Sequence, residues 1–189
     1  MHKMRNTPFF IGKHVRLRAL EPSDVDFLYE AENDTSSWDV ANATVPYSKY
    51  VLTQYVTQSQ SDMFADCQLR LMIVCNDGGE TIGTVDLTDF SPMHRRGELG
   101  IAIKAAWQHK GYAREAIGLM ADYAFRFLRL KQLTVHIAAD NERSLSLVKG
   151  CGFEECGVLK AWWRVEDAYK DVVILQLIRE KYEENCSTF

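Results

Sequence analysis

The segment 101–114 carries the residue types and the spacing of an anion-binding site. It is predicted to be the end of a strand, a short loop with Gln108 and Gly111, and the start of a helix at Tyr112. The first turn of a helix has unpaired N–H groups and a partial positive charge, so its backbone alone can bind phosphate oxygens. Glycine lets the main chain approach them closely. Taken alone, the pattern Gln-x-x-Gly-x-Ala indicates either a phosphate-binding loop or an ordinary helix-capping loop.

Other catalytic and metal-binding patterns are not found in the sequence. His94 and His136 have no cysteine or carboxylate at the spacing of zinc ligands, so we expect no metal. There is no Gly-x-Ser-x-Gly elbow of a hydrolase and no Gly-Lys-Ser/Thr phosphate loop. The five cysteines form no Cys-x-x-Cys pair and favour a reducing compartment, the cytoplasm.

Periodic patterns predict the elements that must position this loop. Alternation of apolar and polar residues indicates strands, and apolar residues at spacings of three and four indicate helices. The predicted elements, in chain order, are a strand at 14–20, helices at 22–33 and 48–60, strands at 68–75, 81–87 and 97–103, a helix at 112–128, a strand at 133–137, a helix at 141–149 and strands at about 157–165 and 171–177. This order predicts an α/β fold with a mixed sheet.

Composition and charge narrow the class of protein. With 189 residues, 47% of them hydrophobic and 25% charged, we expect one globular domain over residues 1–189. The net charge of −4 has the wrong sign for a protein that binds phosphate backbones. No apolar run approaches the roughly 18 residues of a membrane helix. We therefore expect neither nucleic acid nor a membrane as a partner.

Residues 95–153 resemble the core of the Gcn5-related N-acetyltransferase (GNAT) superfamily. Three family motifs occur in the family's order: the Q/R-x-x-G-x-G/A loop as Gln108, Gly111 and Ala113, the Asn-x-x-(Ser/Ala) helix start as Asn141 and Ser144, and the Gly-Phe pair as Gly152-Phe153. The resemblance extends over nearly the whole chain and implies a mixed, mostly antiparallel central sheet flanked by about four helices. Within the superfamily, the sequence is most similar to the branch of bacterial spermidine N-acetyltransferases and ribosomal-protein N-terminal acetyltransferases. Residues 94–98 and 121–125 in particular resemble the spermidine enzymes.

The resemblance implies a binding site for acetyl-CoA in a V-shaped opening between the strands that end near Ile103 and Ile137. The pantetheine arm is expected to pair with backbone groups of residues 101–103, and the pyrophosphate to lie on the amides of residues 108–114. The implied cofactor-binding residues are Ile101, Ala102, Ile103, Gln108, His109, Lys110, Gly111, Tyr112, Ala113, Arg114, Asn141, Ser144 and Lys149.

The resemblance also implies transfer of the acetyl group from the thioester sulfur to a primary amine. An alkyl ammonium has a pKa of about 10, so a base must remove a proton before the amine can attack. Glu98 matches the family position that often supplies this base. At the position of the family's usual acid, a tyrosine, this sequence has Val148. The general acid is therefore not identified, and the alternatives are Tyr112, Cys151, Tyr169 and water.

The expected acceptor is a small-molecule amine, with a spermidine-like polyamine favoured. The irregular, aromatic segment 35–47 contains the candidate substrate residues Trp38, Asp39 and Tyr47. Two other functions stay open: a protein N-terminal or side-chain acetyltransferase with a peptide amine as substrate, and a module that binds acyl-CoA without catalysis. Homo-oligomerisation is compatible with the sequence.

Overall fold

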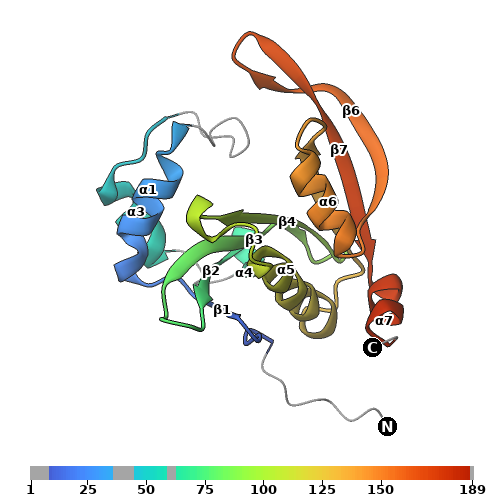
Figure 1. The fold of residues 1–189 in the computed structure, drawn as a ribbon, viewed down its shortest axis with the longest axis horizontal. Coiled ribbons are helices and arrows are strands. Elements are labelled where there is room, and N and C mark those ends of the chain that lie inside the picture. Colours follow the sequence, from blue (N-terminus) through green and yellow to red (C-terminus); the bar gives the residue numbers. More distant parts are fainter. Residues whose placement is uncertain (1–8, 36–44, 59–62, 188–189) are drawn as a thin grey trace.

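A single sheet organises the protein. The computed structural model describes residues 9–35, 45–58 and 63–187. They form a seven-stranded sheet in the order β1-β2-β3-β4-β5-β7-β6 (Figure 1). The strands are β1 (Val15–Arg18), β2 (Leu69–Cys75), β3 (Thr81–Ser91), β4 (Arg96–Ile103), β5 (Gln132–Ala138), β6 (Glu154–Val165) and β7 (Ala168–Ile178). All neighbouring pairs are antiparallel except β4 and β5, which are parallel. The predicted mixed, mostly antiparallel sheet is confirmed.

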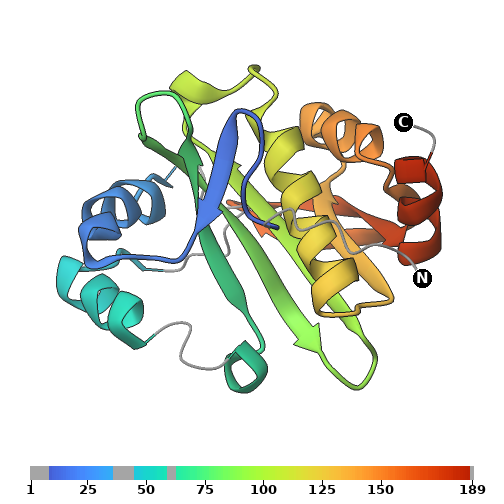
Figure 2. The ribbon, with the colours of Figure 1, turned by 90° about the horizontal axis from the view of Figure 1, so that it is seen from below.

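Helices cover both faces of the sheet (Figures 1 and 2). On one face, α1 (Val25–Glu32), which follows the short 3-10 turn η1 (Pro22–Asp24), packs beside α3 (Lys49–Gln58). On the other face lie α5 (Tyr112–Asp122) and α6 (Glu142–Gly150). The predicted helices are therefore present in the predicted order.

The strand β2 shows how the sequence separates the two cores. Its even-numbered residues Met72 and Val74 pack under α1 and α3, while Leu71, Ile73 and Cys75 face the larger core under α5. Successive side chains of a strand point to opposite faces. A strand that is buried on both sides therefore has an uninterrupted apolar sequence.

The structure adds elements that the sequence patterns do not predict. The α-helix α5 ends at Asp122 and continues as one π-helical segment, η4 (Tyr123–Phe127), in which the rings of Tyr123 and Phe127 stack. A short helix α4 (Met63–Asp66) and a C-terminal helix α7 (Arg179–Ser187) are also present. The sequence of α7 is largely charged and has no clear apolar period. Tyr182 of this helix packs against the main core.

Candidate active site

The loop before α5 has the backbone of an anion-binding turn. It follows the 3-10 turn η3 (Ala105–Trp107), and its residues His109 and Gly111 both have positive φ, at 62° and 84°. Gly111 is the N-cap of α5 in the left-handed conformation, which glycine adopts without steric cost. The N–H groups of the first turn of α5 therefore face this loop without an intrahelical acceptor.

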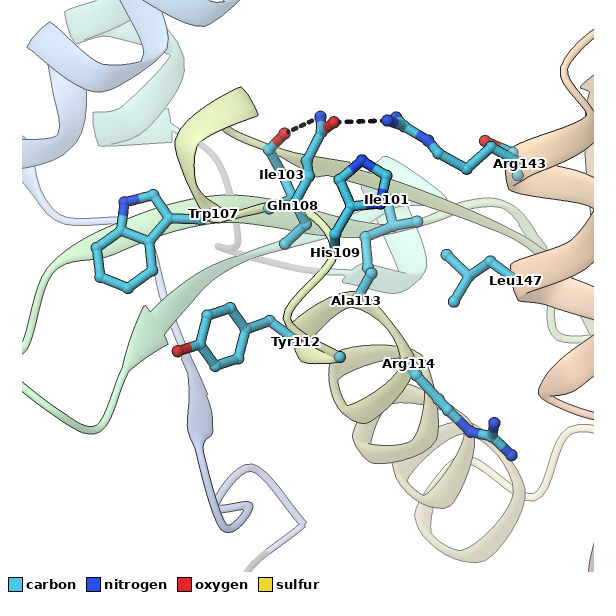
Figure 3. Close-up of a pocket in the computed structure, with 12 residues that line it drawn as sticks. Ile101, Ile103, Trp107, Gln108, His109, Tyr112, Ala113, Arg114, Arg143 and Leu147 are labelled. Carbon is cyan, nitrogen blue, oxygen red and sulfur yellow. Dashed lines mark hydrogen bonds between the residues drawn. The ribbon is translucent and has the colours of Figure 1, made fainter.

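A pocket of about 190 Å³ lies at this helix start, between the end of β4 and α6 (Figure 3). Among the residues expected to bind the cofactor, those that line the pocket are Ile101, Ile103, Gln108, His109, Gly111, Tyr112, Ala113, Arg114 and Ser144. Apolar strand residues thus form one wall, and helix N–H groups and Arg114 give the pocket positive potential. This combination suits a ligand with an alkyl arm and phosphate groups.

Four of the expected cofactor residues do not line this pocket. The side chain of Ala102 points to the opposite face of β4 from Ile101, because strand residues alternate. Lys110 extends over the ring of Trp107, 4.7 Å from its centroid. Asn141 caps α6, where its Oδ1 accepts the N–H of Ser144 at 3.1 Å. Lys149 pairs with Glu155 on the exposed side of α6, with Nζ and Oε2 3.1 Å apart.

The structure adds Trp107, Arg143 and Leu147 to the pocket. Arg143 donates from Nη1 to Oε1 of Gln108 at 2.7 Å, and Gln108 donates from Nε2 to the carbonyl of Ile103 at 2.8 Å (Figure 3). These two hydrogen bonds join α6 to the end of β4 across the pocket. The spacing of Arg143 and Leu147 around Ser144 on one helix is a signal that could have identified them, because residues three and four apart share a helix face.

The strands β4 and β5 diverge beside this pocket. Their pairing ends where Glu98 meets Thr134, although β4 continues to Ile103 and β5 to Ala138. Residues 99–103 and 135–138 are therefore not hydrogen-bonded to each other. The predicted divergence of the two strands is therefore present.

Glu98 lies on the face opposite the pocket, at the start of this divergence. Its side chain is 33% exposed, and its Oε1 lies 2.9 Å from Nδ1 of His136 on β5. The next residue of β4 on this face is Gly100, where an added Cβ would have Asp86 of β3 as its nearest neighbour. A carboxylate is thus accessible from the side away from the pocket. Sequence spacing alone did not indicate His136, because only the register of β4 and β5 brings it to Glu98.

Arg70 of β2 balances two carboxylates on the same face. Its Nε lies 2.7 Å from Oδ1 of Asp86, and its Nη1 lies 2.5 Å from Oε1 of Glu32 on α1. Burial lowers the pKa of Arg70, but the charge of Asp86, the hydrogen bonds with Asp86 and the charge of Glu32 together raise it by more, so the net shift of the pKa is upward. The guanidinium therefore stays charged and fastens α1 to the sheet.

The candidate substrate residues are only partly placed. Trp38 and Asp39 lie outside the described residues. Tyr47 packs against the core between α1 and α3, and its backbone N–H and carbonyl both bond the side chain of Asn33 at 2.8 and 2.9 Å. These two hydrogen bonds join the end of α1 to the start of α3. They thereby hold together the two ends of the segment that contains Trp38 and Asp39.

Two negative findings apply to the described part of the chain. In residues 9–35, 45–58 and 63–187 there is no group of three or more His, Cys, Asp or Glu side chains that could hold a metal ion. No helix within the same ranges combines the length and the apolar character that crossing a membrane requires.

Comparison with known proteins decides the family. The acetyltransferase (GNAT) domain family matches residues 14–154. The chain belongs to the GNAT acetyltransferase family. This match confirms the resemblance to the GNAT superfamily and the predicted fold. It also confirms the predicted enzyme class, an N-acetyltransferase that uses acetyl-CoA.

Spermidine N-acetyltransferases are among the similar GNAT proteins. The spermidine N(1)-acetyltransferase of Vibrio cholerae is 29% identical over 175 residues, which cover 91% of this chain and 97% of the relative. A solved structure of spermidine N-acetyltransferase from Vibrio cholerae in complex with CoA and spermine superposes with a TM-score of 0.81 at 27% identity, covering 91% of this chain and 99% of that chain. A dodecameric structure of the Vibrio enzyme gives a TM-score of 0.77 at 29% identity, covering 92% and 99%.

This GNAT chain differs from the family pattern at Val148, which is 4% exposed and belongs to the main core. Its side chain has no proton to donate. Tyr112 lies at the pocket, but Figure 3 shows its ring directed away from Leu147, and burial and a hydrogen bond with Cys75 raise its pKa. Burial also raises the pKa of Cys151, and Tyr169 is 64% exposed near the turn of the final hairpin. Within the part of the chain that the structure describes, Val148 therefore leaves the family's position without a proton donor.

Proposed function

We propose that this GNAT enzyme acetylates a primary amine of a polyamine such as spermidine. The observation that carries the proposal is the arrangement around the end of the β4–β5 pairing. The pocket with Arg114 and the helix start lies on one face of the sheet, and the Glu98 carboxylate lies on the other. A thioester held in the pocket and an amine beside Glu98 would meet between the diverging strands. The relatives named for spermidine support this class of acceptor.

Acetyl-CoA would bind through the pocket residues. The backbone of residues 101–103 would pair with the pantetheine arm, and the amides of residues 108–114 would bind the pyrophosphate. Arg114 and Arg143 would add charge complementarity to the phosphates. Asn141, which holds the first turn of α6 in place, would lie at the pantetheine side, and Ser144 and Lys149 toward the adenosine end.

Glu98 would act as the general base. The ammonium group of the acceptor carries an extra proton at neutral pH, since its pKa is about 10. Glu98 removes that proton, and the nitrogen lone pair attacks the thioester carbon. A backbone N–H near Ile101 or Ala102 stabilises the charge that develops on the carbonyl oxygen. Because Val148 has no proton to donate, water protonates the departing thiolate.

The acceptor's remaining positive charges would be recognised near Trp38, Asp39 and Tyr47. Aromatic faces and a carboxylate both attract alkyl ammonium groups. Glu32 and Glu30 on α1 contribute less, because Arg70 and Lys104 already face them at 2.5 and 3.8 Å. The acidic surface available to a polycation is therefore modest.

An acceptor screen tests the function. The purified protein is mixed with acetyl-CoA and either spermidine, a monoamine, or a peptide with a free N-terminus, and the release of CoA thiol is followed. We expect release with spermidine and little with the peptide. Preferential use of the peptide would overturn the polyamine assignment, and cofactor binding without thiol release from any amine would overturn catalysis itself.

We further propose that residues 1–189 act as one domain, in the cytoplasm, as a homo-oligomer. Four free cysteines in the described part of the chain, Cys67, Cys75, Cys151 and Cys156, are compatible with a reducing compartment. The dodecameric state of the Vibrio enzyme supports self-association. So do the exposed side chains of Val158, Trp162 and Tyr169 on the final hairpin.

A further inference from the structure

His136 has no part in the mechanism above, yet its ring lies against the carboxylate of Glu98. Its Nδ1 is buried and lies 2.9 Å from Oε1 of Glu98. The contact is not aligned as a hydrogen bond, and Nδ1 has no other hydrogen-bond partner among the described residues. A buried polar atom without an aligned partner costs free energy. An apolar side chain at position 136 would avoid this cost in free energy. The presence of a histidine there therefore suggests that its ring has a function.

The register of the sheet directs this ring to Glu98. Glu98 pairs with Thr134, and His136 follows two residues later on the same face of β5. The residue of β4 that would otherwise lie beside the ring is Gly100, which has no side chain. The imidazole can therefore lean back toward Glu98, at the point where the two strands separate.

The other charged groups near Glu98 on this face are paired with one another. Arg96 of β4 itself pairs with Asp89 of β3. Asp86 of β3 and Glu32 of α1 both contact Arg70 of β2. On the far side of β5, β7 presents the uncharged residues Ile174 and Gln176, opposite His136 and Thr134. Among the residues that the structure describes, His136 is thus the titratable group that contacts the Glu98 carboxylate.

We propose that His136 is a positioning residue for Glu98, an inference that rests on the proposed role of Glu98 as the base. In the tautomer with hydrogen on Nδ1, the ring donates to Oε1 and leaves Oε2 to take the proton. An N–H bond of the acceptor ammonium breaks, an O–H bond forms at Oε2, and the freed electron pair of the nitrogen attacks the thioester carbon. The C–S bond then breaks, and the second proton that the nitrogen loses passes through water to the departing thiolate. The imidazole neither gains nor loses a proton. Hydrogen bonds of catalytic groups often align only when the substrate is bound, which accounts for the present geometry.

Three substitutions of His136 test this role. His136→Leu removes the donor, His136→Gln places an amide near the position of Nε2, and His136→Asn places an N–H near that of Nδ1. We expect the Leu and Gln variants to lose about 10- to 100-fold in kcat/KM for the amine at pH 7, less than the full contribution of a general base. The loss should shrink at pH 9.5, where free amine is plentiful. The Asn variant should keep most of the activity, and KM for acetyl-CoA should not change.

His14 provides a matched control. Its Nδ1 lies 3.1 Å from Oε2 of Glu115 on α5, a similar pair on the side of the sheet opposite Glu98. His14→Gln should leave kcat/KM at the wild-type value at both pH values. Thermal unfolding of each variant separates a loss of activity from a loss of folded protein.

The double variant Glu98→Gln, His136→Gln distinguishes positioning from an independent effect. If His136 acts through Glu98, the double variant is no slower than Glu98→Gln alone. The inference would be overturned, while the proposed function stands, by either of two results. One is a loss of kcat/KM in the double variant equal to the product of the two single losses, and the other is wild-type activity of both His136→Leu and His136→Gln. Full activity of Glu98→Gln would instead remove the proposed base, and the inference with it.

Discussion

At the scale of single residues, the proposed chemistry depends on where Glu98 lies. A carboxylate on a strand is in most proteins a solvated surface group. Here it stands beside His136, at the last paired position of β4 and β5, and on the face opposite the pocket. This position gives it access to an amine that approaches the diverging strands. The sequence shows that position 98 is a glutamate, but the proposed role of this carboxylate as a base depends on the register of β4 and β5.

The Glu98→Gln substitution tests the base directly. It removes the proton acceptor while keeping the size and polarity of the side chain. We expect kcat/KM for the amine to fall about 100-fold or more at pH 7 and much less at pH 9.5, because a larger share of the amine is then already deprotonated. Initial rates of CoA release at both pH values measure the effect. Glu180→Gln, which alters an exposed pair with Lys131, is the control. Equal losses at both pH values would contradict the assignment.

At the scale of elements, the loop–helix unit at α5 carries the cofactor assignment. Gly111 has a φ of 84° and Gly118 lies within the helix. Gly111→Ala should cost about 1–2 kcal/mol, because a Cβ is strained in the left-handed region. Gly118→Ala should add about 0.5–1 kcal/mol of stability, as alanine does in a helix interior. Urea unfolding should show shifts of opposite sign, and calorimetric titration should show weaker CoA binding for Gly111→Ala alone. Shifts of the same sign would refute this view of the loop.

The connection from β1 to α1 predicts a pH dependence of stability. Asp24 is 4% exposed, and its carboxylate accepts two hydrogen bonds from Arg18 at 2.6 and 2.7 Å and one from the N–H of Glu21 at 2.8 Å. Burial raises the pKa of Asp24, but these hydrogen bonds together lower it by a larger amount, so the net shift of the pKa is downward. The ionised form therefore stabilises the fold above the ordinary pKa of about 3.9, and this contribution is lost as the pH falls through the lower folded value.

Asp24→Asn should therefore lower the free energy of unfolding by about 2 kcal/mol at pH 7. The difference from wild type should narrow as the pH falls below about 4. Urea unfolding at pH 7, 5 and 3 measures this change. Asp26→Asn is the control, since Asp26 is 77% exposed and its pair with Lys49 contributes little. A difference that does not vary with pH would argue against the ion pair as its cause.

At the scale of the whole molecule, the end of the sheet formed by β6 and β7 leaves apolar groups exposed. Trp162 is 58% exposed and Tyr169 is 64% exposed, and β6 is the last strand of the sheet. An edge strand with exposed aromatic groups is prone to associate with another chain. This feature is consistent with the homo-oligomer proposed above.

Light scattering coupled to size-exclusion chromatography measures the oligomeric state. We expect a mass that is a multiple of the 21.7 kDa chain at micromolar concentration. Trp162→Ser should reduce this mass if the hairpin lies in the contact, whereas Tyr50→Ser, an exposed aromatic group on α3, should not. A single species of 21.7 kDa for the wild type would contradict self-association.

Patterns between near neighbours in the chain made much of this protein predictable. The alternation in β2, the apolar period of α5 and the loop with Gln108 and Gly111 are local, so the sequence alone determined the seven strands, the four main helices and the position of the loop before α5. It did not predict α4, α7 or the π-helical segment. Tertiary structure alone decided which distant residues meet. It brought Arg143 to Gln108 and His136 to Glu98, because α6 lies across the pocket from the end of β4 and because β4 and β5 pair in one register before they diverge. Packing also buried Val148 in the main core, and it paired Glu32 with Arg70 on the face of the sheet that carries Glu98.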